Sequence, residues 1–130
     1  MNRLFISVLT VFVAVLLVAC KPELVSTFKA QDSVTVYLYK NDHVVDKHSF
    51  DKKSPGYAAI LGWVKKNKSD WNATTATYLP ALLIEGNDFS LNVRTDITVF
   101  KYQDGQYYKN NSPGDYVWFK NQLGLVAPPK

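Results

Sequence analysis

The feature that most limits what this 130-residue chain can fold into is its one cysteine, Cys20, which ends an apolar run. The run from Leu4 to Ala19 follows a basic residue, Arg3, and is broken only by Ser7 and Thr10. A bilayer span needs about 20 apolar residues, and this run stops after sixteen. The pattern predicts a cleaved signal peptide, so the run is excluded from the folded domain.

The end of the run resembles the lipobox of bacterial lipoproteins. Its four positions are Leu17, Val18, Ala19 and Cys20. The resemblance implies that residues 1–19 are removed and that Cys20 carries lipid on its sulfur and, in many bacteria, on its new amino group. Lys21, rather than an aspartate, follows the cysteine. A residue other than aspartate at this position resembles the pattern of outer-membrane lipoproteins. The resemblance implies a lipid-anchored protein of the cell envelope that faces the periplasm.

Lipidation at Cys20 limits both the location and the chemistry of the domain. Each buried methylene contributes about 0.8 kcal/mol to membrane binding, so two or three acyl chains hold a protein firmly. The same modification consumes the only thiol. The domain must therefore be stable by packing, without a disulfide, and a thiol enzyme is excluded.

The length and charge of the remaining chain are those of one small domain without an affinity for nucleic acid. Removal of Arg3 with the signal leaves fourteen Lys and Arg against eleven Asp and Glu. This excess is spread along the chain, whereas phosphate binding requires a dense patch. The one short cluster, Lys65, Lys66 and Lys68, suits a helix C-terminus or, alternatively, contact with anionic lipid headgroups.

The first part of the chain after the lipid site predicts a tether, a hairpin and a helix. Residues 20–32 lack an apolar period and read as a tether. From Ser33 the residues alternate, and Asn41-Asp42 separates this strand from a partner over residues 43–50. Ser54 and Pro55 then suit the start of a helix. Its buried stripe is Tyr57, Ile60, Leu61 and Val64.

The second part predicts a loop, a meander and a second helix. Residues 67–77 read as a loop. Trp71 within it and Trp63 on the preceding helix are assigned to the core. Four strands are expected, over residues 78–85, 89–94, 97–102 and 106–110. In the second of these, Phe89, Leu91 and Val93 face inward while Ser90, Asn92 and Arg94 face solvent. A helix capped by Ser112-Pro113, with the stripe Tyr116, Phe119 and Leu123, should end at Gly124.

These elements predict a single α+β domain over residues 33–125, followed by a tail over 126–130. The expected fold has an antiparallel sheet of about six strands and two helices, in the order ββ-α-ββββ-α. The order is similar to that of cystatin-like proteins, in which a sheet wraps a helix. No cystatin motif is present, so the similarity concerns topology alone.

The sequence offers little chemistry for catalysis, a metal or a cofactor. Asp46 and His48 share one face of their strand by alternation, and His43 lies on the other, so the three should not meet on one ion. Glu85 and Asp88 flank a turn, where acidic residues are common. There is no serine-hydrolase elbow and no glycine-rich phosphate loop. We therefore expect a protein that is not an enzyme and has no cofactor and no metal.

Aromatic residues give the one positive indication of a binding surface. Tyr37 and Tyr39 lie opposite the apolar residues of their strand, and Trp118 lies opposite the stripe of its helix. Tyrosine and tryptophan often anchor protein interfaces. These three residues form the candidate binding face, although the alternative that both faces of the sheet are covered stays open.

Three functions remain compatible with these features. The first is a protein-binding lipoprotein, such as an inhibitor or an immunity protein against a toxin that reaches the envelope. The second is an accessory or structural subunit of an envelope complex. The third is a small-ligand or glycan-binding lipoprotein, which requires a sizeable pocket with converging polar groups.

Overall fold

The computed structural model of the protein describes residues 23–125, which form one antiparallel sheet with three helices. The helices are α2 (Leu24–Lys29), α3 (Pro55–Lys66) and α4 (Asp115–Gln122). The strands are β1 (Ser33–Lys40), β2 (His43–Asp51), β3 (Asn72–Ala73), β4 (Leu82–Gly86), β5 (Phe89–Val93), β6 (Ile97–Tyr102) and β7 (Gly105–Asn110). The predicted α+β class and the single antiparallel sheet are confirmed.

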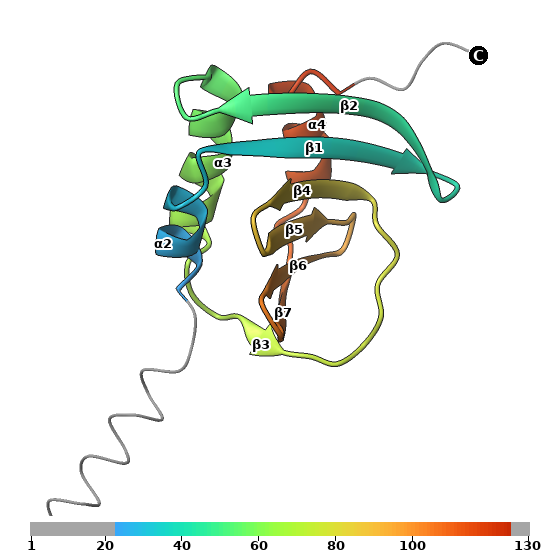
Figure 1. Ribbon diagram of the computed structural model, residues 1–130. Coiled ribbons are helices and arrows are strands. Elements are labelled where there is room, and N and C mark those ends of the chain that lie inside the picture. The colour runs from blue at the N-terminus through green and yellow to red at the C-terminus, as the bar shows by residue number, and fades with distance from the viewer. Residues whose placement is uncertain (1–22, 126–130) are drawn as a thin grey trace, which may run out of the picture.

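The path of the chain passes over both faces of the sheet. The strand order is β2-β1-β4-β5-β6-β7-β3, so β2 and β3 lie at opposite edges. Helix α3 joins these two edges on one face, and the segment after β3 returns to β4 in the middle of the sheet (Figure 1). The three helices therefore share one face, and the opposite face has no helix within residues 23–125.

The first hairpin and α3 form where the sequence predicts them. Asn41 and Asp42 have φ angles of 50° and 63°, as a tight hairpin turn requires. Ser54 caps α3, because its hydroxyl accepts a hydrogen bond of 3.2 Å from the backbone N–H of Tyr57. The helix presents Ile60 and Val64, both fully buried, to the sheet.

Aromatic side chains connect the helices to the sheet. The Trp63 ring centroid lies 5.3 Å from that of Phe119 on α4 and 6.5 Å from that of Trp71. Trp71 reaches Phe100 on β6 at 6.0 Å, and Phe100 reaches Phe89 on β5 at 5.7 Å. Such tilted and edge-on pairs contribute about 0.5–1.5 kcal/mol beyond their buried area. The assignment of Trp63 and Trp71 to the core is confirmed.

The tether predicted over residues 20–32 is wrong from residue 24 onward, because α2 belongs to the core. Leu24 and Phe28, four residues apart, are 2% and 0% exposed. The Phe28 ring lies 4.7 Å from that of Tyr57, whose hydroxyl donates to the backbone carbonyls of Phe28 and Gln31. Burial raises the pKa of the Tyr57 phenol, and the nearby Asp32 carboxylate raises it further.

Three other elements differ from the prediction. Within the expected loop, Asn72 and Ala73 form β3, an edge strand paired with β7. The strand expected from residue 78 begins at Leu82, because Pro80 has no backbone N–H for a sheet hydrogen bond. The last helix begins at Asp115 rather than at Ser112, since Gly114 holds a left-handed φ of 88°.

Candidate functional site

The strand register determines which side chains lie on the helix-free face of the sheet, called the open face here. Residues directly opposite each other on paired strands point to the same side. One row on this face, crossing from β2 to β7, is Lys47, Tyr37, Leu83, Asn92, Val99 and Tyr108. The neighbouring row is Ser49, Thr35, Glu85, Ser90, Lys101 and Gln106. The open face thus carries one row with aromatic and aliphatic residues beside one polar row.

Two of the predicted binding residues lie together at the β1 end of the open face. The rings of Tyr37 and Tyr39 are 6.4 Å apart between centroids, and both side chains are partly exposed. The Lys47 Nζ lies 5.5 Å from the Tyr37 ring centroid, a cation–π arrangement. Val44, which is 48% exposed, pairs with Tyr39. We call Tyr37, Tyr39 and Val44 the aromatic patch.

Trp118 does not join this patch. It is 38% exposed, so the predicted exposure is right. It lies on α4, however, next to Phe119, which packs against Trp63 in the core between the helices and the sheet. Tyr37 and Tyr39 point to the opposite side of the sheet. The three residues of the predicted binding face therefore belong to two separate surfaces.

Residues 74–80 form a strap that crosses the open face between β3 and β4 and is anchored by side chains of the sheet. Asn92 donates to the Leu79 carbonyl at 3.1 Å and accepts from the Ala81 N–H at 3.0 Å. Arg94 also donates to the Leu79 carbonyl. At the other end, Gln106 donates to the Ala76 carbonyl at 2.7 Å. The strap is thereby fixed at both ends.

The strap changes the environment of Asn92. The β5 pattern places this amide on the solvent side, yet only 7% of Asn92 is exposed. The prediction that it faces solvent is wrong, because strand alternation indicates the side of the sheet and not what covers it. A buried amide that satisfies two backbone groups is a structural anchor.

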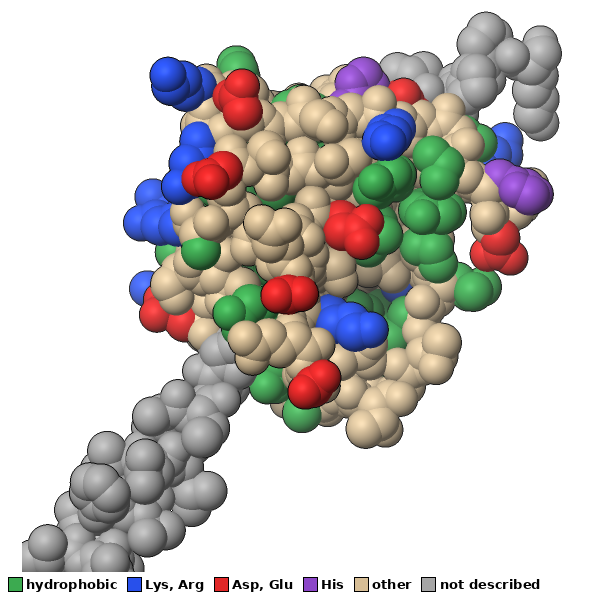
Figure 2. Space-filling view, in the orientation of Figure 1, with side chains coloured by type: hydrophobic (Ala, Val, Ile, Leu, Met, Phe, Trp, Pro, Cys, Tyr) green, Lys and Arg blue, Asp and Glu red, His purple; other side chains and the backbone are tan. Residues whose placement is uncertain are grey.

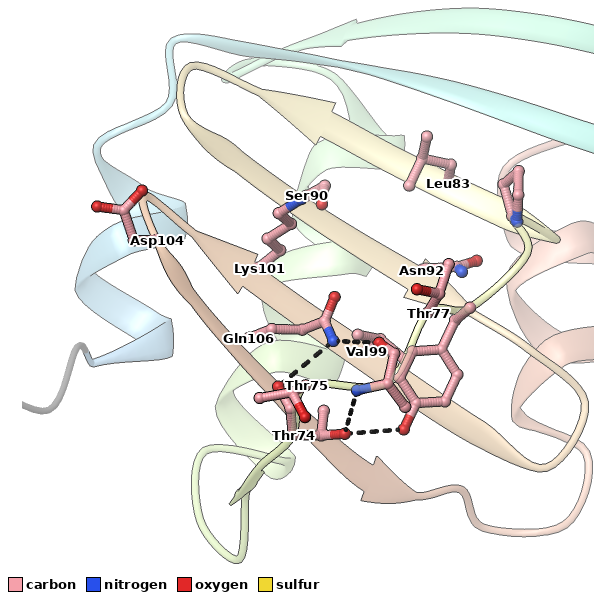
Figure 3. A pocket seen from close by; sticks show the side chains of 13 residues that line it. Thr74, Thr75, Thr77, Leu83, Ser90, Asn92, Val99, Lys101, Asp104 and Gln106 are labelled. Carbon is pink, nitrogen blue, oxygen red and sulfur yellow. Dashed lines mark hydrogen bonds between the residues drawn. The ribbon is translucent and has the colours of Figure 1, made fainter.

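Between the strap and the sheet lies a cleft of about 550 Å³, the strap cleft. Leu83 contributes apolar surface to it above the nearly buried Val99, and Ser90 and Lys101 lie beside each other as cross-strand partners (Figure 3). The other lining residues are Thr74, Thr75, Ala76, Thr77, Tyr78, Pro80, Asn92, Asp104 and Gln106. The space-filling view of this face shows hydrophobic side chains gathered beside a hollow (Figure 2). This volume falls within the range of about 300–1,000 Å³ typical of ligand sites.

The structure places both histidines on the same side of β2 as Asp46. His48 and Asp46 lie 3.1 Å apart, from Nε2 to Oδ1. The register of β2 slips at Val45, a bulge, so His43 pairs with Lys40 and falls on the same side as Asp46. The expectation that His43 lies on the opposite face is therefore wrong. No group of three or more metal-ligating side chains occurs within residues 23–125.

The two acidic residues near the β4–β5 turn are both exposed. Glu85 lies in the polar row of the open face, opposite Thr35 and Ser90. Asp88 holds a φ of 52° in the turn, and its carbonyl accepts a hydrogen bond from the Gln103 N–H. The turn function expected for Asp88 agrees with this geometry.

The lipobox residues Leu17, Val18, Ala19 and Cys20 lie outside the described residues. Among the helices of residues 23–125, none is long and apolar enough to cross a membrane. No protein-family model, no curated protein and no solved structure matches this chain.

Proposed function

We propose that this protein is a lipid-anchored lipoprotein of the bacterial cell envelope that binds a protein partner through the open face of its sheet. The anchor rests on the lipobox pattern that ends at Cys20. The binding role rests on one observation above all: Tyr37 and Tyr39 stay partly exposed, side by side, on the face without helices.

The side chains of the aromatic patch suit contact with a protein partner. A tyrosine brings large apolar area with little conformational entropy to lose, and its hydroxyl still forms hydrogen bonds when water is excluded. Lys47 over the Tyr37 ring adds a cation that can meet an acidic group of the partner. Val44 extends the apolar area along β2. This combination resembles the aromatic centre with a polar rim that protein interfaces use.

The binding proposal is tested by recovery of the partner from envelope extract. Tyr37→Ala combined with Tyr39→Ala should leave the circular-dichroism spectrum unchanged and reduce partner recovery at least about tenfold, as loss of two interface anchors does. Trp118→Ala is the matched control, because it removes an exposed aromatic from the other side of the sheet. Full recovery with the double variant would refute the proposal. The identity of the partner separates a toxin inhibitor from an envelope subunit.

The anchoring proposal has its own test. Cys20→Ala removes the sulfur that would accept the lipid, so an unprocessed precursor should accumulate in the inner membrane. Metabolic labelling with a clickable palmitate analogue should mark the parent chain and not the variant. Normal cleavage of the Cys20→Ala chain at the same site would contradict lipidation.

A further inference from the structure

The strap cleft adjoins the aromatic patch, because Leu83 of its lining pairs with Tyr37, but its hydroxyls come from other residues. Thr75, Thr77 and Ser90 have no side-chain hydrogen-bond partner within residues 23–125. Lys101 is not in either of the two ion pairs of that range. All four groups can donate a hydrogen bond, and the three hydroxyls can also accept one. The cleft therefore offers polar groups that the fold itself does not use.

The cleft is held open by residues other than these four. Gln106, Asn92 and Arg94 anchor the strap at its two ends, and the Thr74 hydroxyl lies 3.2 Å from that of Tyr78 within the strap. Figure 3 shows the Gln106 amide nitrogen bonded to the strap. A preformed site loses less conformational entropy on binding than one that must be assembled.

The lining indicates the chemistry of the occupant. Its charged side chains are one lysine, Lys101, and one aspartate, Asp104, so it has no net charge. A polyphosphate would need several cations, and an acyl chain would need a mostly apolar wall. Leu83, Ala76 and Pro80 interrupt the polar lining with apolar surface. A ligand matched to this lining is uncharged, rich in hydroxyls and apolar on part of its surface.

The sheet beneath the cleft argues against an extended peptide as the occupant. Strands β4, β5 and β6 are each paired on both sides, so their backbone groups cannot bind an added strand. Recognition must rely on side chains, most of which are hydroxyls and amides. We infer that the strap cleft binds a neutral saccharide, with Ser90, Thr77 and Lys101 bonding its hydroxyls and Leu83 contacting its apolar face.

Calorimetric titration of the full chain in nanodiscs tests this inference. The probes are chitohexaose, cellohexaose and maltohexaose, which differ in linkage and substituents, with inorganic phosphate as an anionic probe. At least one saccharide should bind and phosphate should not. Thr77→Val combined with Ser90→Ala removes two hydroxyls without touching a strap anchor and should raise the Kd about tenfold. Lys101→Met, which keeps the aliphatic stem, should also weaken binding.

Thr95→Val is the matched control, because Thr95 is an exposed hydroxyl in the β5–β6 turn outside the cleft. It should leave the Kd unchanged. The inference fails if none of the three saccharides binds or if the double variant binds as well as the parent. The double variant should still recover the protein partner, so failure here leaves the proposed function standing.

Discussion

The two faces of the sheet are built from the same strands but have different surroundings. On the helix-covered face, Phe28, Trp63 and Phe119 belong to one buried network of aromatic rings, in which Phe89, Phe100 and Trp71 connect Phe28 to Trp63. On the open face, Tyr37 and Tyr39 keep part of their surface in water, and a strap spans a polar cleft. The comparison teaches that aromatic content alone does not distinguish core from binding surface. Whether an aromatic residue is buried depends on the face of the sheet to which it points and on the segments that cover that face.

The largest expected effect tests how far the helix-covered core extends. Phe28→Ala should lower the free energy of unfolding by about 3–5 kcal/mol, because it opens a cavity where the ring meets Tyr57 and Phe89. Urea denaturation followed by tryptophan fluorescence measures the change. Lys29→Ala, on the exposed side of the same helix, should change stability by less than about 0.5 kcal/mol. If Phe28→Ala and Lys29→Ala both changed the free energy of unfolding by a similar small amount, α2 would not belong to the core and the predicted tether would be correct.

A smaller effect is expected where the open face is held together by Asn92. Asn92→Ala leaves the Leu79 carbonyl with Arg94 alone and the Ala81 N–H without its partner, so stability should fall by about 1–3 kcal/mol. Hydrogen exchange should accelerate over residues 74–80 first. Asn110→Ala, at an exposed position on β7, is the control. Unchanged exchange in the strap would show that Asn92 does not anchor it.

The smallest expected change in stability comes from the Tyr57 hydroxyl, which links α3 to α2 and whose contribution depends on pH. Tyr57→Phe removes a hydroxyl that donates to two carbonyls and should cost about 1 kcal/mol at neutral pH. Burial and Asp32 raise the pKa of Tyr57 in the folded state, so the unfolded chain loses this proton first as the pH rises. The stability from the neutral phenol is fully present below about pH 10, the unfolded pKa, and is lost above it.

Denaturation across pH 9 to about 11.5 tests this sign. The parent chain should lose stability more steeply than Tyr57→Phe over that range. Tyr116 also has its pKa raised by burial, so Tyr116→Phe is the informative comparison and should remove a further part of the slope. Parallel curves for the parent and Tyr57→Phe would contradict the role given to the Tyr57 phenol.

The sequence predicted correctly those elements that depend on residues close together in the chain. The Asn41-Asp42 hairpin and the Ser54 cap of α3 depend on residues within one turn of each other. Helix α2 was not predicted because it has six residues and its sequence pattern consists of a single apolar pair. Leu24 and Phe28, four residues apart, were the available signal. A helix this short is stable through its packing rather than its propensity.

The candidate site was predicted only in part, for a different physical reason. Alternation placed Tyr37 and Tyr39 on the side away from the core, and the structure agrees. Alternation could not show that Trp118 belongs to the other surface, because this depends on where α4 packs. Nor could it reveal the cleft, which exists because residues 74–80 return across the sheet. The paired polar residues Ser90 and Lys101 line a cleft only because of that crossing.

The most direct test of the account compares the two surfaces inside living cells. A photo-crosslinking amino acid is placed at Tyr39 in one strain and at Trp118 in another, in the full 130-residue chain. If the open face recognises the partner, light should produce one discrete adduct from the Tyr39 position and none from the Trp118 position. An adduct from Trp118 alone would contradict the claim that the open face recognises the partner.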